Sequence, residues 1–108
     1  MKASQRYEMM CLLDPGYEEE GYEEKEQRIT QILENAGAEI EEVQKQGKRK
    51  LAYEVQDNQE GLYTLFKFTS DPKSIDAIAD RANVEEGLIR YEIVNRDENY
   101  AAAEANSS

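Results

Sequence analysis

The sequence lacks histidine altogether and has a single cysteine, Cys11, among its 108 residues. These absences exclude an intrachain disulfide, a Cys/His zinc site, a Ser–His–Asp triad and a Cys–His pair within one chain. Most familiar enzyme chemistry is thereby removed, and we expect no catalytic residue, no cofactor and no metal. Cys11 lies in the middle of an apolar run, so we expect a small core residue without reactivity.

Long hydrophobic runs are also missing. No segment approaches the roughly 20 apolar residues needed to cross a bilayer, and the short apolar run near the N-terminus meets polar residues by Asp14. We therefore expect a cytoplasmic protein. Residues 1–96 suffice for one compact domain. Residues 97–108 contain almost nothing large and apolar except Tyr100, and they are expected to form a flexible acidic, alanine-rich tail.

Positive charge is scarce and unevenly placed. The formal net charge is −11, which ordinarily argues against a nucleic-acid partner because phosphate contacts are built from Lys and Arg. Residues 17–42 hold ten acids and two bases, however, and residues 97–108 hold three acids and no base. The remaining residues are balanced, with 11 acids and 11 bases. An acidic helix face can therefore coexist with a local cationic edge.

Hydrophobic periodicity predicts the secondary structure of the first half of the chain. A strand is expected over residues 5–13, where the side chains are apolar on both alternating faces after Glu8, and a turn follows it. A helix is expected from about Glu18, with Gly37 as its left-handed terminating residue. Its apolar stripe has helical spacing and consists of Ile29, Ile32, Leu33 and Ala36.

The second half of the chain predicts a hairpin, a short helix and a last strand. One long strand over residues 38–56, bent or bulged at Gly47, pairs with a second strand through a turn near Asn58 in residues 57–61. Ser70-Asp71-Pro72 indicates a helix start, and Asn83 its end. Residues 88–95 form the last strand. The βαββαβ order predicts a ferredoxin-like α+β fold, with a four-stranded antiparallel sheet and both helices on one face.

A short basic cluster is the clearest binding signal from the residues alone. Lys45, Lys48, Arg49 and Lys50 surround Gly47 without an intervening acid, which suits a strand edge laid along a phosphate backbone. The alternative is a solvated edge that guards against aggregation. The acidic residues of the first helix have no matching Cys, His or Gly-rich loop, so they are most simply a solvated face.

Aromatic residues on the third strand allow two interpretations. Phe66 and Phe68 could stack on RNA bases, but they more simply pack beneath the helices. Tyr63, Leu65 and Lys67 then occupy the open face, where Tyr63 and Leu65 are candidate protein contacts. In the last strand, Arg90 is expected on the open face with Leu88, Glu92 and Val94. There it either pairs with a carboxylate or reaches a phosphate.

Four segments occur in the order and spacing of one known family. They are Arg-Tyr-Glu at residues 6–8, Gly-Lys-Arg-Lys-Leu-Ala-Tyr at 47–53, Glu-Gly-Leu-Tyr at 60–63 and Leu-Ile-Arg-Tyr-Glu-Ile-Val at 88–94. On these motifs the chain resembles bacterial ribosomal small-subunit protein six over nearly residues 5–95. One departure is visible, since the family commonly has proline where this chain has Glu54.

The resemblance implies a structural component of the small ribosomal subunit. Such a protein pairs with small-subunit protein eighteen and binds the central domain of 16S ribosomal RNA with it. The implied phosphate contacts are Lys48, Arg49, Lys50 and Arg90, with Arg6 and Arg96 as secondary candidates. Tyr63, Leu65 and Leu88 are the implied partner contacts. A cationic partner would also reconcile the net charge with a ribosomal role.

Two competing functions have the same expected fold. A small-ligand-binding regulatory module would act as a dimer, would bind a saturable ligand and would not bind RNA. An acylphosphatase-like enzyme would need an anion-binding loop after the first strand. That loop reads Asp14-Pro15-Gly16-Tyr17-Glu18 and places carboxylates where a phosphate must bind, which disfavours the enzyme.

Overall fold

The computed structural model describes the backbone of residues 4–14, 20–55 and 58–97, and their side chains except those of residues 20, 48–55 and 58–60. The elements follow the expected order: β1 (Gln5–Leu13), α1 (Glu20–Asn35), β2 (Glu39–Val55), β3 (Asn58–Ser70), a 3₁₀ turn (Pro72–Ser74), α2 (Ile75–Ala82) and β4 (Leu88–Asn95). The sheet is antiparallel, with strand order β2-β3-β1-β4. The ferredoxin-like prediction is confirmed.

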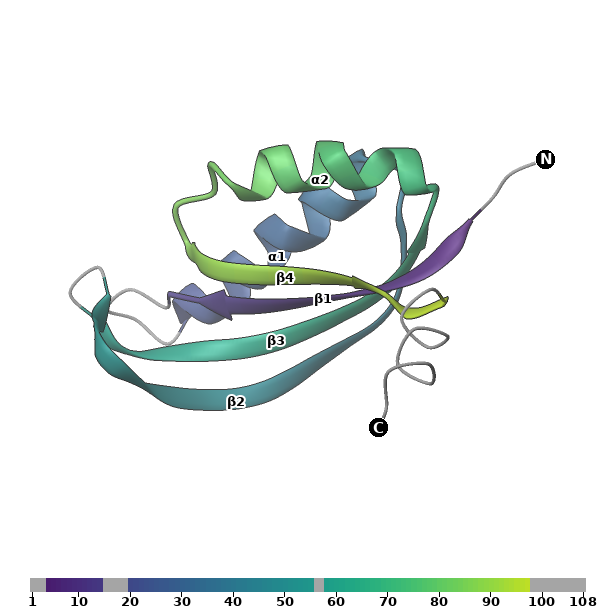
Figure 1. Ribbon diagram of the computed structural model, residues 1–108. Helices are drawn as coiled ribbons and strands as arrows, with labels where there is room; N and C mark the ends of the chain where they lie inside the picture. The colour runs from purple at the N-terminus through teal and green to yellow at the C-terminus, as the bar shows by residue number, and fades with distance from the viewer. Residues whose placement is uncertain (1–3, 15–19, 56–57, 98–108) are drawn as a thin grey trace.

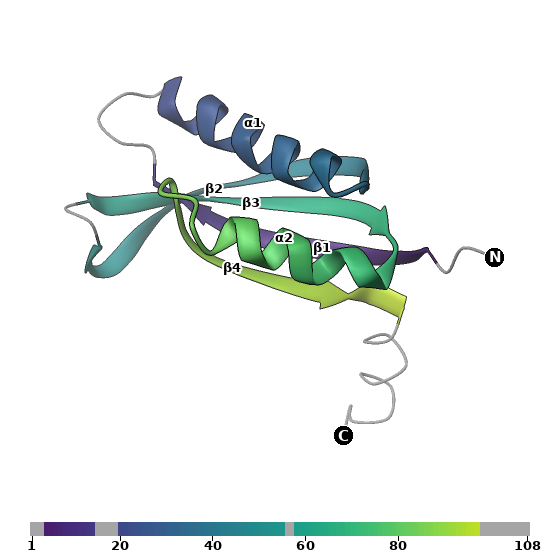
Figure 2. The same ribbon diagram turned by 90° about the horizontal axis from the view of Figure 1, so that it is seen from above.

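Two layers make up the molecule (Figure 1), with both helices on one face of the twisted sheet and the other face free of them. Seen from above (Figure 2), α1 lies over the β2–β3 side, and α2 lies over β1 and β4. Neither described helix has the length and apolar content needed to span a bilayer. The arrangement leaves the open face as the broad surface on which side chains of all four strands meet.

The core lies between the helices and the sheet. Alternate residues of β1 and β3 enter it, and Met9, Phe66 and Phe68 are each 0% exposed. Burying a large apolar side chain contributes about 1.5–3 kcal/mol, so this layer dominates the fold's stability. The predicted packing of Phe66 and Phe68 beneath the helices is confirmed. The remaining core residues come from every element and include Tyr7, Cys11, Leu13, Ile29, Ile32, Leu33, Ala38, Ile78, Ala82 and Leu88.

The helix boundaries have local causes. The backbone N–H of Gly37 donates to the carbonyl of Glu34, and that of Ala38 donates to the carbonyl of Leu33, which is the Schellman pattern that satisfies the last carbonyls of a helix. Gly37 has φ +91°, as predicted. At the second helical segment, the Oδ1 of Asp71 accepts the N–H of Lys73 at 2.9 Å, so Asp71 is the N-cap that the sequence indicated.

The β2–β3 hairpin differs from expectation at its turn. Val55 of β2 pairs with Asn58 of β3, so residues 58–61, expected in the turn, belong to the strand instead. The pairing also shifts register between Lys45 and Gly47, and Gly47 has φ +103°. The predicted bulge at Gly47 is confirmed, because glycine adopts this backbone region without a Cβ clash.

Candidate functional site

The open face of the sheet is the candidate functional site. Alternation along the strands brings even-numbered residues of β1 and odd-numbered residues of β3 to this face. In the strand register, Met10 lies opposite Leu65, and Leu12 lies opposite Tyr63. The prediction that Tyr63, Leu65 and Lys67 share the face opposite to Phe66 and Phe68 is confirmed by their burial pattern.

One half of the open face, here called the apolar half, is mainly apolar, with the charged Arg90 and Glu92 on its β4 side. A hollow of about 430 Å³ is lined by Met10, Leu12, Tyr63, Arg90, Tyr91 and Glu92. Leu12 lies only 2.6 Å from the position that a Cβ would take on Gly61, so the missing side chain at Gly61 makes room for Leu12 on this face. Met10 and Leu12 are not among the site residues expected from the sequence, although the same alternation that places Tyr63 on the open face also places them there.

Leu88 does not belong to this surface. It is 8% exposed and joins the hydrophobic core on the helix side, so the expected open-face position is wrong. The cause is a register shift: Leu12 pairs with Arg90, but Leu13 pairs with Leu88, which leaves Ile89 as an extra residue on β4. A β-bulge of this kind reverses the side-chain alternation. Beyond it, Glu92 and Val94 pair with Met10 and Glu8 and face the open side as expected.

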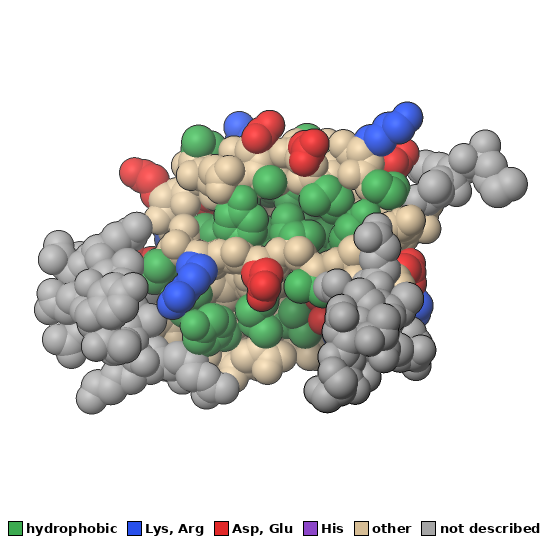
Figure 3. Space-filling model, in the orientation of Figure 1, with side chains coloured by type: hydrophobic (Ala, Val, Ile, Leu, Met, Phe, Trp, Pro, Cys, Tyr) green, Lys and Arg blue, Asp and Glu red, His purple; other side chains and the backbone are tan. Residues whose placement is uncertain are grey.

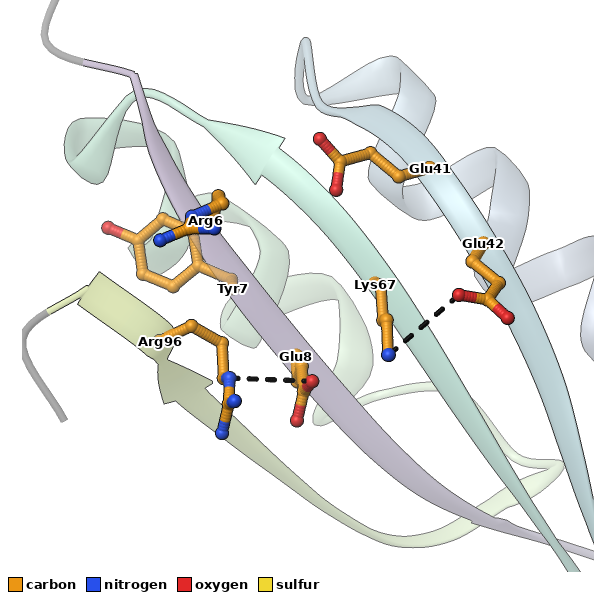
Figure 4. Close-up of a pocket in the computed structure, with 7 residues that line it drawn as sticks. All are labelled: Arg6, Tyr7, Glu8, Glu41, Glu42, Lys67 and Arg96. Atoms are coloured by element: carbon orange, nitrogen blue, oxygen red, sulfur yellow. Dashed lines mark ion pairs between the residues drawn. The ribbon is translucent and has the colours of Figure 1, made fainter. Parts of the chain in front are cut away.

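The other half of the open face is charged. Glu42, Lys67 and Glu8 stand opposite one another on β2, β3 and β1. The Nζ of Lys67 lies 3.8 Å from Oε1 of Glu42, and the Nε of Arg96, just beyond β4, lies 3.5 Å from Oε2 of Glu8 (Figure 4). The four charges alternate in sign across the sheet. They line a groove of about 540 Å³ together with Arg6, Tyr7 and Glu41.

Arg6 is tied to the other end of the chain by Asp97. The Nε and Nη2 atoms of Arg6 donate to Oδ1 of Asp97 at 3.0 and 2.8 Å, and the backbone N–H of Arg6 donates to Oδ2 at 3.1 Å. The backbone N–H and the guanidinium of Arg6 lower the pKa of Asp97. Asp97, the first residue of the expected tail, is therefore held against the start of β1.

The basic cluster lies on edge strand β2, and the backbone of Lys48, Arg49 and Lys50 pairs with Leu62, Gly61 and Glu60 of β3. The side chains of Lys48, Arg49 and Lys50 lie outside the described residues. Lys45 has a different environment, because its Nζ lies 3.8 Å from Oε1 of Glu26 on α1.

Glu26 is an exception to the expected solvated acidic face. Its side chain is 12% exposed and accepts a hydrogen bond of 2.9 Å from the hydroxyl of buried Thr64. Sequence periodicity could not reveal this contact, because Thr64 is distant in the chain. Glu26 thus neutralises Lys45 and leaves residues 48–50 as the remaining part of the predicted cluster.

Metal and thiol chemistry find no support in the described part of the chain. No group of three or more Cys, Asp or Glu side chains there could hold a metal ion. Cys11 is 0% exposed, and burial raises the pKa of its thiol, so the reactive thiolate is disfavoured. Cys11 is a core residue, as predicted.

Comparison with known proteins decides between the candidate functions. The family described as "Ribosomal protein S6" matches residues 6–95. The chain belongs to the ribosomal protein S6 family. Proteins named "Small ribosomal subunit protein bS6" from two Clostridium botulinum strains, 657 / Type Ba4 and Langeland / NCTC 10281 / Type F, are each 38% identical over 95 residues. Each comparison covers 85% of this chain and 98% of the relative.

A solved structure of an S6 family member supports the same assignment. The crystal structure of 30S ribosomal protein S6 from Thermotoga maritima superposes with a TM-score of 0.78 at 26% identity, covering 98% of this chain and 100% of that one. The family resemblance read from four sequence motifs is therefore confirmed. S6 family membership makes this chain a non-enzymatic, structural component of the small ribosomal subunit, and it favours the ribosomal interpretation over the regulatory module.

The noted departure from the family pattern lies in a part of β2 that the structure describes only by its backbone. Glu54 continues the strand, where the S6 family commonly has proline. The ladder is irregular here, because the β2–β3 register shifts between Lys50 and Val55. A proline is tolerated on an edge strand at such a position, so the fold accommodates either residue.

Proposed function

We propose that this chain binds the central domain of 16S ribosomal RNA together with small-subunit protein eighteen, and that its role is assembly rather than catalysis. The observation that carries the proposal is the S6 family match over residues 6–95. The two halves of the open face and the basic edge supply the surfaces that such a role needs.

The RNA contacts are assigned to cations at the edges of the sheet. Lys48, Arg49 and Lys50 follow one another on edge strand β2, where a phosphate backbone can approach without meeting the helices. Arg90 on the other edge strand is exposed and makes no ion pair with any side chain that the structure describes. These four residues are the primary RNA contacts in this proposal.

Arg6 and Arg96 are assigned a secondary role. Arg6 is engaged by Asp97 at 2.8 Å and Arg96 by Glu8 at 3.5 Å. A phosphate must compete with these carboxylates, so each arginine contributes less than one without a carboxylate neighbour.

Protein eighteen is assigned to the apolar half of the open face. Tyr63 lines the hollow of about 430 Å³ with Met10 and Leu12, and Leu65 lies opposite Met10 in the strand register. An amphipathic tyrosine beside aliphatic side chains is typical of the centre of a protein interface. A cationic partner would be attracted by the net charge of −11 and would also lower the repulsion between this chain and RNA.

The test of the basic edge is RNA binding by a triple variant. A central-domain RNA fragment is titrated with the chain plus protein eighteen, using the native chain and Lys48→Ala, Arg49→Ala, Lys50→Ala combined, over a range of salt concentrations. We expect weaker binding and a slope of log K against log [salt] that is smaller by about 2 to 3, since each phosphate contact contributes slightly less than one to the slope.

The matched control removes three bases from the helix layer. Lys25, Lys73 and Arg81 lie on α1, the 3₁₀ turn and α2, and their combined change to Ala alters net charge equally. The control should leave the salt slope within about 0.5 of the native value. Equal effects of both triple variants would mean that only net charge matters, which would contradict the assignment of the β2 edge.

A further inference from the structure

The outer edge of β4 is unlike the outer edge of β2. Both are edge strands in the order β2-β3-β1-β4, so each has backbone N–H and C=O groups without a strand partner among the described residues. Edge strands of this kind can pair with another chain unless charges, bulges or covering elements prevent it. Edge strand β2 has such protection, with exposed Glu39, Glu41 and Glu42 and the bulge at Gly47.

Edge strand β4 also has a bulge, at Ile89, and exposed charges, Arg90 and Glu92, but these two charges have opposite signs and the helix side of the strand is apolar. Apolar side chains gather in a band between α2 and β4 (Figure 3). Ile75 of α2 and Tyr91 and Ile93 of β4 are only partly buried against the core, and Ile89 is also partly exposed. The hydroxyl of Tyr91 bonds to Oδ1 of Asn83 at 2.7 Å, which fixes the strand beneath the end of α2. The edge is thus a strand with an apolar side that is linked to the end of α2.

We propose that β4 pairs antiparallel with β4 of a second copy of this chain, about a twofold axis at Tyr91. The charges on the exposed side of β4 favour a second copy of this chain as the partner. Arg90 and Glu92 are both exposed and flank Tyr91 symmetrically. In a twofold antiparallel pair centred on Tyr91, Arg90 of one copy lies opposite Glu92 of the other, and the reverse pair forms on the other side of the axis.

The order of charges along β4 also favours one register between the two copies of the strand. Opposed residues of antiparallel strands face the same side, so a twofold axis must pass through a residue pair. An axis at Arg90 sets two arginines opposite each other, and an axis at Glu92 sets two glutamates opposite each other. An axis at Tyr91 instead joins opposite charges on the open side. On the helix side it places Tyr91 against Tyr91 of the second copy.

The net charge of −11 on each copy opposes the association at low salt. At about 0.15 M ionic strength, charges further apart than roughly 8 Å are largely screened, whereas the two Arg90–Glu92 pairs are in direct contact. The experiment is therefore performed at that ionic strength, on the full chain without RNA or partner.

The test is sedimentation equilibrium at concentrations up to about 1 mM, with reciprocal charge changes. Arg90→Glu or Glu92→Arg alone sets like charges opposite each other twice per dimer, so each should raise the dissociation constant by about tenfold or more. The double variant Arg90→Glu, Glu92→Arg restores both opposite-charge pairs and should return the constant to near the native value. Lys73→Glu, at an exposed position of the 3₁₀ turn in the helix layer, is the control for Arg90→Glu, because it changes net charge equally, and it should have no effect beyond that change.

Hydrogen exchange locates the contact independently of charge. Amides of β4 should become more protected as protein concentration rises, while those of β2 should not. Thermal unfolding of each variant, followed by circular dichroism, checks that the fold is retained. A chain that stays monomeric at about 1 mM would overturn the proposal. A dimer whose dissociation constant is unchanged by Arg90→Glu and by Glu92→Arg would also overturn it. So would a double variant that does not restore dimerisation, or hydrogen-exchange protection that rises on β2 instead of β4.

Discussion

Neighbouring residues of one strand lie on opposite faces of this sheet. Met9 is 0% exposed in the core, whereas Met10 borders the hollow on the open face. Phe66 and Leu65 divide in the same way. Core packing and the proposed binding surface therefore use alternate positions, and we expect substitutions at adjacent residues to affect different properties.

The corrected position of Leu88 can be tested by stability. Leu88→Ala removes a core side chain and should lower the free energy of unfolding by about 2–4 kcal/mol. Leu65→Ala, on the open face, should cost less than about 1 kcal/mol. Chemical denaturation of the two variants measures both values. A cost at Leu65 equal to or above that at Leu88 would place Leu88 back on the surface.

Asp97 gives the chain a pH-dependent contact. Its pKa is lowered from the ordinary value of 3.8 by the backbone N–H and the guanidinium of Arg6. Because the folded pKa is depressed, this contact adds stability above about pH 4 and loses it as pH falls through the folded pKa. Asp97→Asn should therefore reduce stability at pH 7 and show a smaller further loss on acidification. Thermal unfolding from pH 7 to pH 2.5 checks this, and an unchanged acid response would contradict it.

At the scale of elements, two glycines fix where α1 ends and where β2 bends. Gly37 and Gly47 have φ of +91° and +103°, and a Cβ at either would meet nothing within 4 Å. Space is therefore available at both, and backbone conformation alone requires glycine. This conformational requirement is visible in the sequence, because each glycine interrupts an otherwise regular pattern.

Gly37→Ala tests the conformational requirement. The substitution places a Cβ in the left-handed region and should cost about 1 kcal/mol of stability. Gly37→Asn should cost less, because Asn tolerates that region better than Ala. Denaturant unfolding ranks the three proteins. An alanine variant as stable as the native chain would mean that the helix end does not depend on the Schellman pattern.

Element order, strand faces and both positive-φ glycines could be predicted from local patterns. Three features could not. The position of Leu88 depends on a bulge in the β1–β4 pairing, which alternation along one strand does not reveal. The link from Glu26 to Thr64 and Lys45 joins three elements. The length of the β2–β3 turn depends on pairing between Val55 and Asn58, whereas residues 57–61 contain Asp, Asn and Gly, types that favour a longer turn.

At the scale of the whole molecule, the proposed contacts are divided over the sheet. The basic edge of β2, the charged half and the apolar half of the open face all lie outside the helix layer. The S6 family match shows that the chain is a component of the small ribosomal subunit. In the proposed function, RNA and a protein bind the sheet side together. The acidic residues of α1 lie on the opposite face, away from RNA in this arrangement.

The protein contact can be separated from the RNA contact. Tyr63→Ser combined with Leu65→Ser should weaken association with protein eighteen by about tenfold or more, since aromatic and aliphatic anchors dominate interface energy. Val84→Ser is a matched control, because Val84 is 71% exposed and lies in the loop between α2 and β4. Calorimetric titration measures each affinity. Equal losses in the two variants would remove the apolar half of the open face from the interface.

The most direct test of the central claim is RNA binding with and without the partner. A central-domain 16S RNA fragment is titrated with this chain alone, protein eighteen alone and the two together, at one fixed salt concentration. The account predicts weak binding by this chain alone and tight binding by the mixture, because a net charge of −11 repels RNA until a cationic partner is present. Binding by the mixture that is no tighter than binding by protein eighteen alone would contradict the account.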